Sequence, residues 1–450
     1  MNTIFKILTI TIFLLFGFES RAKSMQGNPI IPNIGMADPH IYIFENRAYL
    51  YATRDADSTA HNFVMPEWNI WSSDDLINWK HERTIDPKET YMGESVRCWA
   101  PAVAHRNGAY YFYFSNGNVN TGVMQGATPS GPFVDALGKP MLDEDLTETK
   151  EYDPSILVED DEDQTAYIVF GHHRDNEEDH FFAIARLSED MISLDEEPKE
   201  IIITGDQNVL KGNDKPNLHK HNGIYYLSAG THYATSKNVY GPYVKTGDTG
   251  NGKFGLDSRA HGNFFKWNGQ WFHTWCHFHL GKDVARYRES YISYLHYKDN
   301  GEMLTDTVFL NRHFSTGVGQ YDARWDKIEA EWYMAASGVE KRESINGGFE
   351  IQHVTDNGYL YFPNIQNLKN VNSMKFYIAS DKGGTIEVRE GSVNGSLLGS
   401  LRFSKTGGMT KYQEITGKIS NLDQVKDICL VFKGKHEDIL HLDWFSFETK

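Results

Sequence analysis

The chain has 450 residues, of which 40% are hydrophobic and 13% are aromatic, so it holds enough apolar material for two hydrophobic cores. Its formal net charge of −17 argues against a nucleic-acid partner, because phosphate binding needs a concentrated basic surface. A neutral ligand fits this charge better. The three cysteines, Cys98, Cys276 and Cys429, are far apart and odd in number. At most one disulfide could form, and we expect none to hold the fold.

The N-terminus has the pattern of a secretion signal. Lys6 precedes an apolar run over residues 7–16, and Ser-Arg-Ala follows at 20–22. The run is too short to cross about 30 Å of hydrocarbon, so residues 1–22 are predicted to be a signal peptide, with an uncleaved anchor as the alternative. No later segment is apolar for long enough to span a bilayer. We therefore expect a secreted or periplasmic protein.

A two-part unit returns five times after the signal. Each copy has a short polar turn, usually containing an X-Pro step, and then an aromatic strand about ten residues later. The aromatic markers lie roughly 46 to 61 residues apart, in or near the range of a four-stranded propeller blade. These markers are Tyr49, Tyr110, Tyr167, Tyr225 and Trp271.

The strands alternate aromatic and β-branched residues between Asn-Gly turns, and long helical periodicity is absent. The prediction is an all-β chain with a five-bladed β-propeller over residues 28–315. A β-sandwich over this region would not explain the returning unit. The expected blades cover about 36–95, 96–150, 151–212, 213–257 and 258–315.

Three of the returning turns carry an aspartate, namely Asp38, Asp153 and Asp214. One Asp beside Pro is usually only a turn opener. Three carboxylates in matching registers of one repeat instead predict a shared pocket, because the inner strands of all blades start at one end of the channel. Carboxylates forced together cannot all ionise, so one can keep a proton while another stays charged. Glycosidic-bond cleavage needs such a pair.

Four segments, taken in order, resemble glycoside hydrolase family 43: 36–40, 99–103, 152–155 and 287–290. Members of that family are five-bladed propellers that cleave arabinosyl, xylosyl and related linkages with inversion. The resemblance implies that Asp38 is the general base, that Asp153 tunes and orients the acid, and that Asp214 is the general acid.

One departure from the family pattern concerns the acid. The family normally has a Glu before a small residue and Pro, whereas this chain has Asp214, Lys215 and Pro216. An Asp carboxyl lies about 1 to 1.5 Å farther back, which can cost about a hundredfold in rate. The backbone could advance to compensate, Glu151 could serve instead, or the site could bind sugar without cleaving it. Lys215 would lower the pKa of Asp214 if its amine reached it; alternatively, it points to solvent.

Three further residues have roles implied by the resemblance. His261 would lie near the sugar or ligate a calcium or similar ion within the channel, although a histidine after a polar segment is often simply hydrogen-bonded. Arg288 is similar to an arginine that lines the sugar pocket, where its planar fork could hold a hydroxyl or the catalytic carboxylate. Trp99 would form an apolar wall at the sugar ring, or pack within its blade.

Two histidine groups invite a transition-metal interpretation, because such sites use His and carboxylate ligands. The first is His273, His277 and His279, and the second begins at His172 and precedes an acidic run. Neither spacing is diagnostic of zinc. Loop histidines above a sugar pocket, where His277 or His172 could shape substrate choice, are the favoured interpretation.

The repeat ends near residues 316–325, and residues 325–450 are predicted to form a second all-β unit. Its two ends are similar to carbohydrate-binding module family 6. The resemblance implies a jelly-roll sandwich with a structural calcium held by Glu329, Glu331 and Asp443, unless these acids are merely solvated. Sugar binding by this module is open, because Met409 stands where such modules often place a Trp. Tyr359, Tyr361 and Tyr412 could supply an aromatic face or belong to the core.

The sequence thus predicts a secreted, inverting, exo-type glycosidase that removes arabinofuranosyl or xylosyl residues from plant-type glycans, with calcium as its only cofactor. The alternatives are a catalytically weakened glycan-binding propeller and a galactose-releasing enzyme of the same fold. A retaining five-bladed enzyme such as a fructan hydrolase would differ in the anomer of its product.

Overall fold

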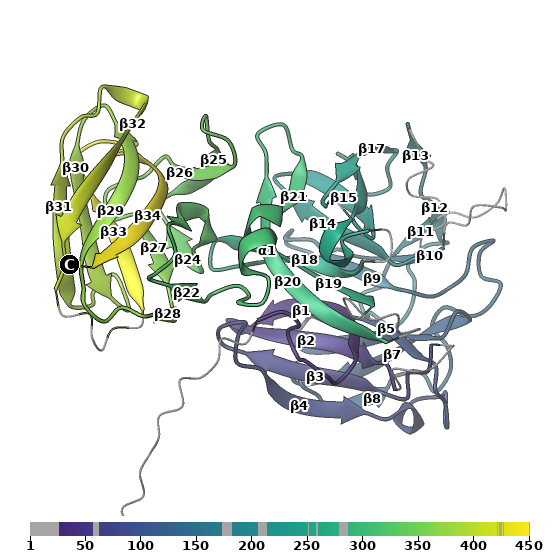
Figure 1. Cartoon of the computed structure of the whole chain (residues 1–450). Helices are drawn as coiled ribbons and strands as arrows, with labels where there is room; N and C mark the ends of the chain where they lie inside the picture. Colours follow the sequence, from purple (N-terminus) through teal and green to yellow (C-terminus); the bar gives the residue numbers. More distant parts are fainter. Residues whose placement is uncertain are drawn as a thin grey trace, which may run out of the picture.

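The computed structural model (Figure 1) describes residues 27–56, 63–172, 182–205, 214–250, 252–257, 260–278, 287–420, 422, 425 and 427–449. The predicted signal peptide lies outside these residues. Strands dominate the described part, which has one α-helix, α1 (Thr307–His313), and short 3₁₀ turns at Pro87–Glu89, Lys253–Gly255 and Ala330–Trp332. The all-β prediction is confirmed.

Five sheets form the first domain, and in each of them four antiparallel strands follow one another outward in chain order. The first sheet is β1 (Met36–Phe44), β2 (Arg47–Arg54), β3 (Trp68–Ser73) and β4 (Lys80–Ile85). The second is β5 (Cys98–Arg106), β6 (Ala109–Asn116), β7 (Asn120–Gly126) and β8 (Phe133–Asp135). The third is β9 (Ser155–Val158), β10 (Ala166–Gly171), β11 (Phe182–Arg186) and β12 (Lys199–Glu200).

The last two sheets complete the propeller. The fourth is β14 (Pro216–His221), β15 (Ile224–Ala229), β16 (His232–Ser236) and β17 (Tyr243–Asp248). The fifth is β18 (His261–Trp267), β19 (Gln270–Phe278), β20 (Arg288–Tyr297) and β21 (Met303–Thr305). One predicted blade boundary is wrong, because β13 (Ile203–Thr204) does not belong to the third blade. It pairs in parallel with the outer strand of the fourth, Ile203 against Tyr243.

The inner strands form a closed ring around the channel, in which β1, β5, β9, β14 and β18 contact one another in order and β18 returns to β1. Side chains close the ring between the first and last blades. The Asn263 amide donates to Ile41 O and its oxygen accepts from Ile41 N, both at 2.9 Å. The segment before β1 also joins the last blade, since Ile30 N donates to Ser290 O at 2.8 Å. These bonds fix the starts of β1 and β18 side by side.

The second domain is a sandwich of two sheets at the other end of the molecule (Figure 1). One sheet orders β25 (Glu340–Glu343), β26 (Phe349–Gln352), β34 (His441–Thr449), β29 (Val371–Ser380) and β32 (Gly408–Lys418), with β23 (Ile328–Glu329) paired to β34. The other orders β24 (Ala335–Ser337), β27 (Tyr359–Phe362), β33 (Ile428–Lys433), β30 (Gly384–Glu390) and β31 (Leu397–Phe403). The linker strand β22 (Tyr321–Asp322) pairs with β28 (Ile365–Gln366), which follows β27 of the sandwich.

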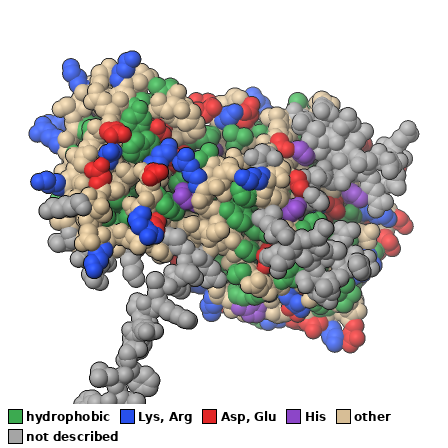
Figure 2. Space-filling model, in the orientation of Figure 1, with side chains coloured by type: hydrophobic (Ala, Val, Ile, Leu, Met, Phe, Trp, Pro, Cys, Tyr) green, Lys and Arg blue, Asp and Glu red, His purple; other side chains and the backbone are tan. Residues whose placement is uncertain are grey.

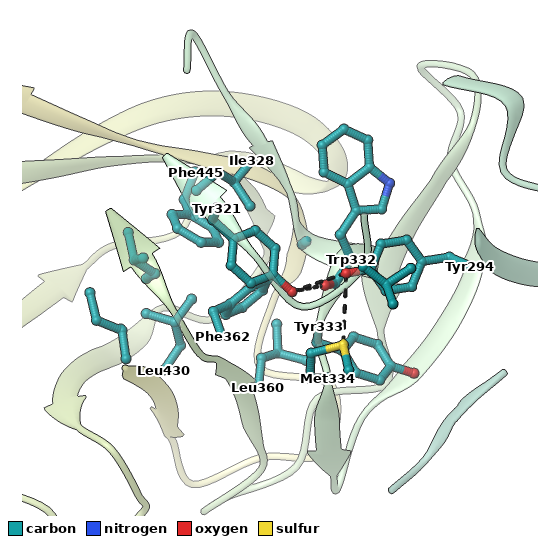
Figure 3. Packing of buried hydrophobic residues seen from close by; sticks show 14 of the residues in the cluster. Tyr294, Tyr321, Ile328, Trp332, Tyr333, Met334, Leu360, Phe362, Leu430 and Phe445 are labelled. Carbon is teal, nitrogen blue, oxygen red and sulfur yellow. Dashed lines mark hydrogen bonds between the residues drawn. The ribbon is translucent and has the colours of Figure 1, made fainter. Parts of the chain in front are cut away.

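One continuous hydrophobic cluster joins the two domains, running from the first and last blades through the linker into the sandwich core. Figure 3 shows its middle, where Tyr294 of β20 meets Tyr321 of β22 and Trp332. The Tyr294 and Tyr321 hydroxyls lie 3.1 Å apart, and the Tyr321 hydroxyl donates to Trp332 O. Phe362 and Phe445 of the sandwich continue the packing. The shared core makes the junction part of the fold rather than a flexible tether.

The surface carries charge of both signs. On the face drawn in Figure 2, basic and acidic side chains are interspersed over the sandwich. Cys98, Cys276 and Cys429 are buried and unpaired. Within the described ranges, no helix has the length and apolar character needed to cross a bilayer.

Candidate active site

The turns that open the inner strands have an uncommon backbone. Asp38 and Asp153, each directly before a proline, adopt left-handed conformations with φ of 49° and 54°. This region costs a residue with a Cβ about 1–2 kcal/mol. In the first blade the turn also shifts the pairing register between Ala37 and His40. The turn aims each carboxylate into the channel mouth instead of along its sheet.

The fourth blade departs from the expected register. Its left-handed residue before proline is Lys215, with φ of 63°, so Lys215 rather than Asp214 occupies the position that Asp38 and Asp153 hold in their blades. The prediction that three carboxylates share one register is therefore wrong by one residue. Asp214 still reaches the same site from the preceding position, and its charge raises the pKa of Asp153.

Asp38 lies at the centre of a buried network and is 3% exposed. His261 Nδ1 donates to Asp38 Oδ1 at 2.9 Å, and Arg288 Nη1 donates to the same oxygen at 2.5 Å. The Cys276 thiol approaches it at 3.5 Å. A Cβ on Gly262 would lie 1.9 Å from Thr274 O, so only glycine lets β18 pack this closely on β19 beside His261.

Arg288 is held from its other side by Asp55, which stands at the end of β2. Asp55 Oδ2 accepts from Arg288 N at 2.7 Å and from Nε at 3.1 Å, and Oδ1 accepts from Nη2 at 3.0 Å. The guanidinium therefore spans two carboxylates and cannot rotate away from Asp38. Of the two contacts that the resemblance implied for Arg288, a sugar hydroxyl or a carboxylate, the structure shows the contact with the Asp38 carboxylate.

The two buried aspartates of the mouth have opposite proton affinities. Burial alone would raise the pKa of Asp38, but the charge of Arg288 and the hydrogen bond from His261 outweigh it and hold this pKa well below its usual range. Burial raises the pKa of Asp153 well above its usual range, and the charges of Asp214 and Asp38 raise it further. Asp38 therefore stays ionised while Asp153 keeps a proton. Burial lowers the pKa of His261, which leaves the ring neutral near pH 7.

Asp214 lies at the more open side of this group. Its side chain is 34% exposed, whereas that of Lys215 is 14% exposed, and Lys215 Nζ lies 3.5 Å from Asp214 Oδ1. The lysine amine thus reaches Asp214, which was one of the two alternatives predicted for it. Glu151, the other candidate acid, is 1% exposed and accepts from Thr147 N at 2.8 Å and from the Thr147 hydroxyl at 2.9 Å. These bonds turn one Glu151 oxygen toward its own loop.

An aromatic wall stands beside the carboxylates. The half-buried Trp99 ring meets Phe63 edge-on at 5.9 Å and Tyr152 at 6.3 Å, and Tyr152 in turn meets His172 at 5.9 Å. The Arg288 guanidinium lies 4.8 Å from the centre of the Phe63 ring. Trp99 therefore combines the two interpretations given to it, since it packs against neighbouring rings within a wall next to the site.

The predicted histidine groups do not form a metal set in the described part of the chain. His279 and residues 173–180 lie outside the described residues. His273 is buried, and its Nδ1 lies 2.7 Å from the Thr305 hydroxyl, so it serves packing. No three His, Cys, Asp or Glu side chains among the described residues are arranged to hold a metal ion.

The acids expected to bind calcium in the sandwich crowd one another. Burial raises the pKa of Glu331 well above its usual range, and the charges of Glu329 and Asp443 add to this. Burial, together with Glu329, raises the pKa of Asp443 to about 6. Glu331 Oε2 is buried without a hydrogen-bond partner among the described residues. Carboxylates that repel one another are suited to bind a hard cation such as calcium. The side chains of Glu329, Glu331 and Asp443 would have to move closer together to coordinate one ion.

Sequence reasoning missed Asp55, Phe63 and Cys276. None of them belongs to the returning turn unit or to the segments that carry the family resemblance. Asp55 of the first blade binds Arg288 of the fifth, and Cys276 of β19 approaches Asp38 of the first blade, so both contacts form only where the first blade packs against the fifth. A buried acid able to pair with the predicted Arg288 was the signal that could have found Asp55.

An ionised carboxylate and a protonated one at the same mouth can exchange protons with water and with a leaving oxygen, which is the acid–base chemistry of glycosidic hydrolysis. Fold and site together define a propeller glycosidase. Family comparison agrees, because the model of glycosyl hydrolases family 43 matches residues 26–310 and that of carbohydrate binding module family 6 matches residues 329–449. The chain belongs to glycosyl hydrolases family 43, and the resemblance inferred from its motifs is confirmed.

Similar proteins span both domains. An arabinoxylan arabinofuranohydrolase of Paenibacillus polymyxa is 28% identical over 98% of this chain and 78% of its own length. A β-D-galactofuranosidase of Aspergillus niger is 29% identical over 64% of this chain and 87% of its own. The crystal structure of a family 43 arabinoxylan arabinofuranohydrolase from Bacillus subtilis, in complex with cellotetraose, has a TM-score of 0.55 at 22% identity and covers 95% of this chain and 98% of that one. This last likeness supports the two-domain fold.

Proposed function

We propose that the protein is a secreted, inverting glycosidase that removes arabinofuranosyl or xylosyl residues from arabinoxylan-type glycans. The observation that carries the chemistry is the opposite pKa displacement of Asp38 and Asp153 at one channel mouth. The choice of sugar is supported by the activity named for the relative that matches both domains. Secretion is supported by the N-terminal pattern alone.

In this proposal each carboxylate has one task. Asp38 is the general base, because Arg288 and His261 keep it ionised and aim one oxygen. It takes a proton from the water that attacks the anomeric carbon. Asp214 gives a proton to the leaving oxygen from the open side of the site, and Asp153 tunes and orients it. The neutral His261 and the aromatic wall at Trp99 bound the space for the sugar ring.

The test is a panel of nitrophenyl pentosides and of arabinoxylan oligosaccharides, with Asp38→Asn as the control. We expect release of arabinose or xylose by the wild type and its loss in the variant. Proton NMR of the first product, recorded before mutarotation, is expected to show the inverted anomer. A retained anomer would exclude the proposed mechanism. Sugar binding without release that depends on Asp38 would favour the second candidate, a glycan-binding propeller.

That second candidate is favoured by one observation, the Asp at the position of the family's acid: the Asp214 side chain is 34% exposed, and its carboxyl lies one methylene farther back than that of a Glu. A galactose-releasing enzyme is the further alternative, supported by the name of the Aspergillus niger relative. Nitrophenyl galactofuranoside in the same panel distinguishes it, because a furanosidase specific for galactose would leave the pentosides intact.

We also propose that the sandwich binds one structural calcium through Glu329, Glu331 and Asp443. The support is the crowding of these acids and the unpartnered Glu331 oxygen. A second proposal concerns the propeller, where an ion would lie in the channel beside His261. The Nδ1 atom of this histidine donates to Asp38. Calcium would supply rigidity to the sandwich and no step of the hydrolysis. Equilibrium dialysis with calcium, comparing wild type with Glu329→Gln and with His261→Gln, measures both.

A further inference from the structure

Lys215 is placed as a catalytic carboxylate would be. It is the left-handed residue before proline in its blade, with φ of 63°, beside 49° at Asp38 and 54° at Asp153. The same backbone at the same point of the ring gives the same side-chain direction, into the channel mouth. A side chain with a Cβ is strained in this left-handed region, whereas the family pattern has a small residue. Strain of this kind at a site entrance points to a role for the side chain.

The lysine amine faces the carboxylates and not the solvent. Its side chain is 14% exposed, less than half the exposure of its partner Asp214. Its charge lowers the pKa of Asp38 and of Asp153 and also that of His261. A lysine directed outward would act on Asp214 alone. The Lys215 amine therefore lies close enough to act on Asp38 and Asp153 as well as on Asp214.

The charges of the site divide between two cations. Arg288 is engaged by Asp38 and Asp55 through five hydrogen bonds from its backbone and guanidinium. Asp214 instead pairs with Lys215 at 3.5 Å. Without the ammonium, the Asp214 carboxylate would lose this ion pair and could turn toward the solvent to which it is already open.

We propose that Lys215 is a positioning residue, whose ammonium holds the short Asp214 carboxylate at the channel mouth and offsets the repulsion among the three aspartates. The inference deepens the proposed hydrolase function and rests on it. An Asp is one methylene shorter than the Glu of the family pattern, and a glycine before the proline could not hold it. A longer Glu in the family pattern and an Asp held by a lysine in this chain would thus place the acid carboxyl at the same point of the channel mouth.

The test compares Lys215→Met, which keeps length and backbone strain but removes the charge, with Lys215→Arg, which keeps the charge. We expect Lys215→Met to lower kcat on the pentoside cleaved by the wild type by about a hundredfold, with a smaller change in KM, and to move the pH profile upward. Lys215→Arg is expected to stay within about tenfold of the wild type. Equal losses in both variants, or an unchanged pH profile in Lys215→Met, would overturn the inference.

The matched control is Lys220→Met. Lys220 lies on β14, the strand that Lys215 directly precedes, five residues farther along and hence about 16 Å away, and its Nζ pairs with Glu159 Oε2 at 2.6 Å. Loss of this ion pair should leave kcat unchanged. The double variant Asp214→Glu with Lys215→Gly installs the family pattern and should recover most of the activity that Lys215→Gly alone loses. Wild-type activity in Lys215→Gly would contradict the proposal.

Failure of the proposed function would show as a wild type that cleaves no glycoside in the panel. The positioning role is then decided by thermal unfolding at pH 5 and pH 8. Removing Lys215 leaves the three aspartates unscreened only while they are ionised, so the loss of Tm in Lys215→Met should be larger at pH 8 than at pH 5. For Lys220→Met the loss should be nearly equal at both. A pH-independent loss in Lys215→Met would reject the role without reference to activity.

Discussion

Asp153 lies at the channel mouth and Asp306 at the domain junction. These two aspartates are almost equally buried, at 5% and 6% exposed, but their pKa values are shifted in opposite directions. Asp306 accepts from Phe309 N at 2.8 Å, from His296 Nε2 at 3.0 Å and from Trp332 Nε1 at 2.6 Å. Burial would raise its pKa, but these bonds outweigh burial and lower it. Asp153 faces two other carboxylates, and its pKa is raised.

The difference shows that burial alone does not identify a functional acid. Donors from α1, β20 and the linker surround Asp306, so its charge is a fixed part of the junction. At the mouth, the same residue type meets like charges and keeps its proton. The junction also carries Lys341, whose Nζ donates to Gln270 Oε1 at 2.6 Å across the two domains. A buried aspartate thus carries a fixed charge at the junction and a retained proton at the mouth.

The largest effect is expected for Asp38→Asn at the channel mouth. Loss of the base should lower kcat/KM on the cleaved pentoside by about a thousandfold or more, measured with the nitrophenyl substrate. The fold should remain, because Asn can still accept from His261. Circular dichroism and the urea midpoint serve as the control. Activity within tenfold of the wild type would remove Asp38 from the base role.

Asp306→Asn should do the reverse, with a large effect on stability and little on chemistry. The amide has one acceptor oxygen, so it cannot accept from Phe309 N on one side and from His296 and Trp332 on the other, and the free energy of unfolding should fall by about 3 kcal/mol. The pKa of Asp306 is lowered in the folded state, so its stabilisation is present above the unfolded value near 3.9 and is lost as pH falls through the folded value. Urea unfolding at pH 7 and pH 3 should therefore converge for variant and wild type at the lower pH.

Asp153→Asn should change activity and stability in opposite directions. We expect a loss of about a hundredfold in kcat together with a gain in stability at high pH. The folded pKa of Asp153 is raised, so in the wild type stability is lost as pH rises through that value, and the neutral Asn escapes this loss. Thermal unfolding across pH 5 to 9 measures it. A variant that is less stable than the wild type at every pH would contradict the assigned ionisation.

The smallest expected effect concerns the sandwich acids. If calcium binds at Glu329, Glu331 and Asp443, a tenfold excess over its Kd stabilises the folded state by about 1.4 kcal/mol, and a chelator reverses this. Because burial and Glu329 raise the pKa of Asp443 to about 6, protons compete below that pH and the stabilisation should shrink. Thermal unfolding with calcium, magnesium and chelator at pH 5 and pH 8 tests this. No response to calcium in the wild type would reject the site.

Much of the architecture was predictable because it repeats. The returning turn and aromatic strand predicted five blades and placed Asp38, Asp153 and Asp214 at one mouth, where the structure brings them together. The same argument misplaced the register of Asp214, because a repeat matched by its proline does not show which preceding residue turns left-handed. The edge strand β13 was missed for a similar reason, since two residues in an irregular stretch carry no periodicity.

The sequence by itself determined the all-β fold, the two domains and the identity of the candidate acids, since alternation, turns and repeat spacing are local properties. Only the tertiary structure decided which acid keeps its proton, that Asp55 holds Arg288 and that Lys215 turns inward. Proton affinity depends on burial and on charges within a few ångströms. Those neighbours come from different blades, and the ring must close before they meet.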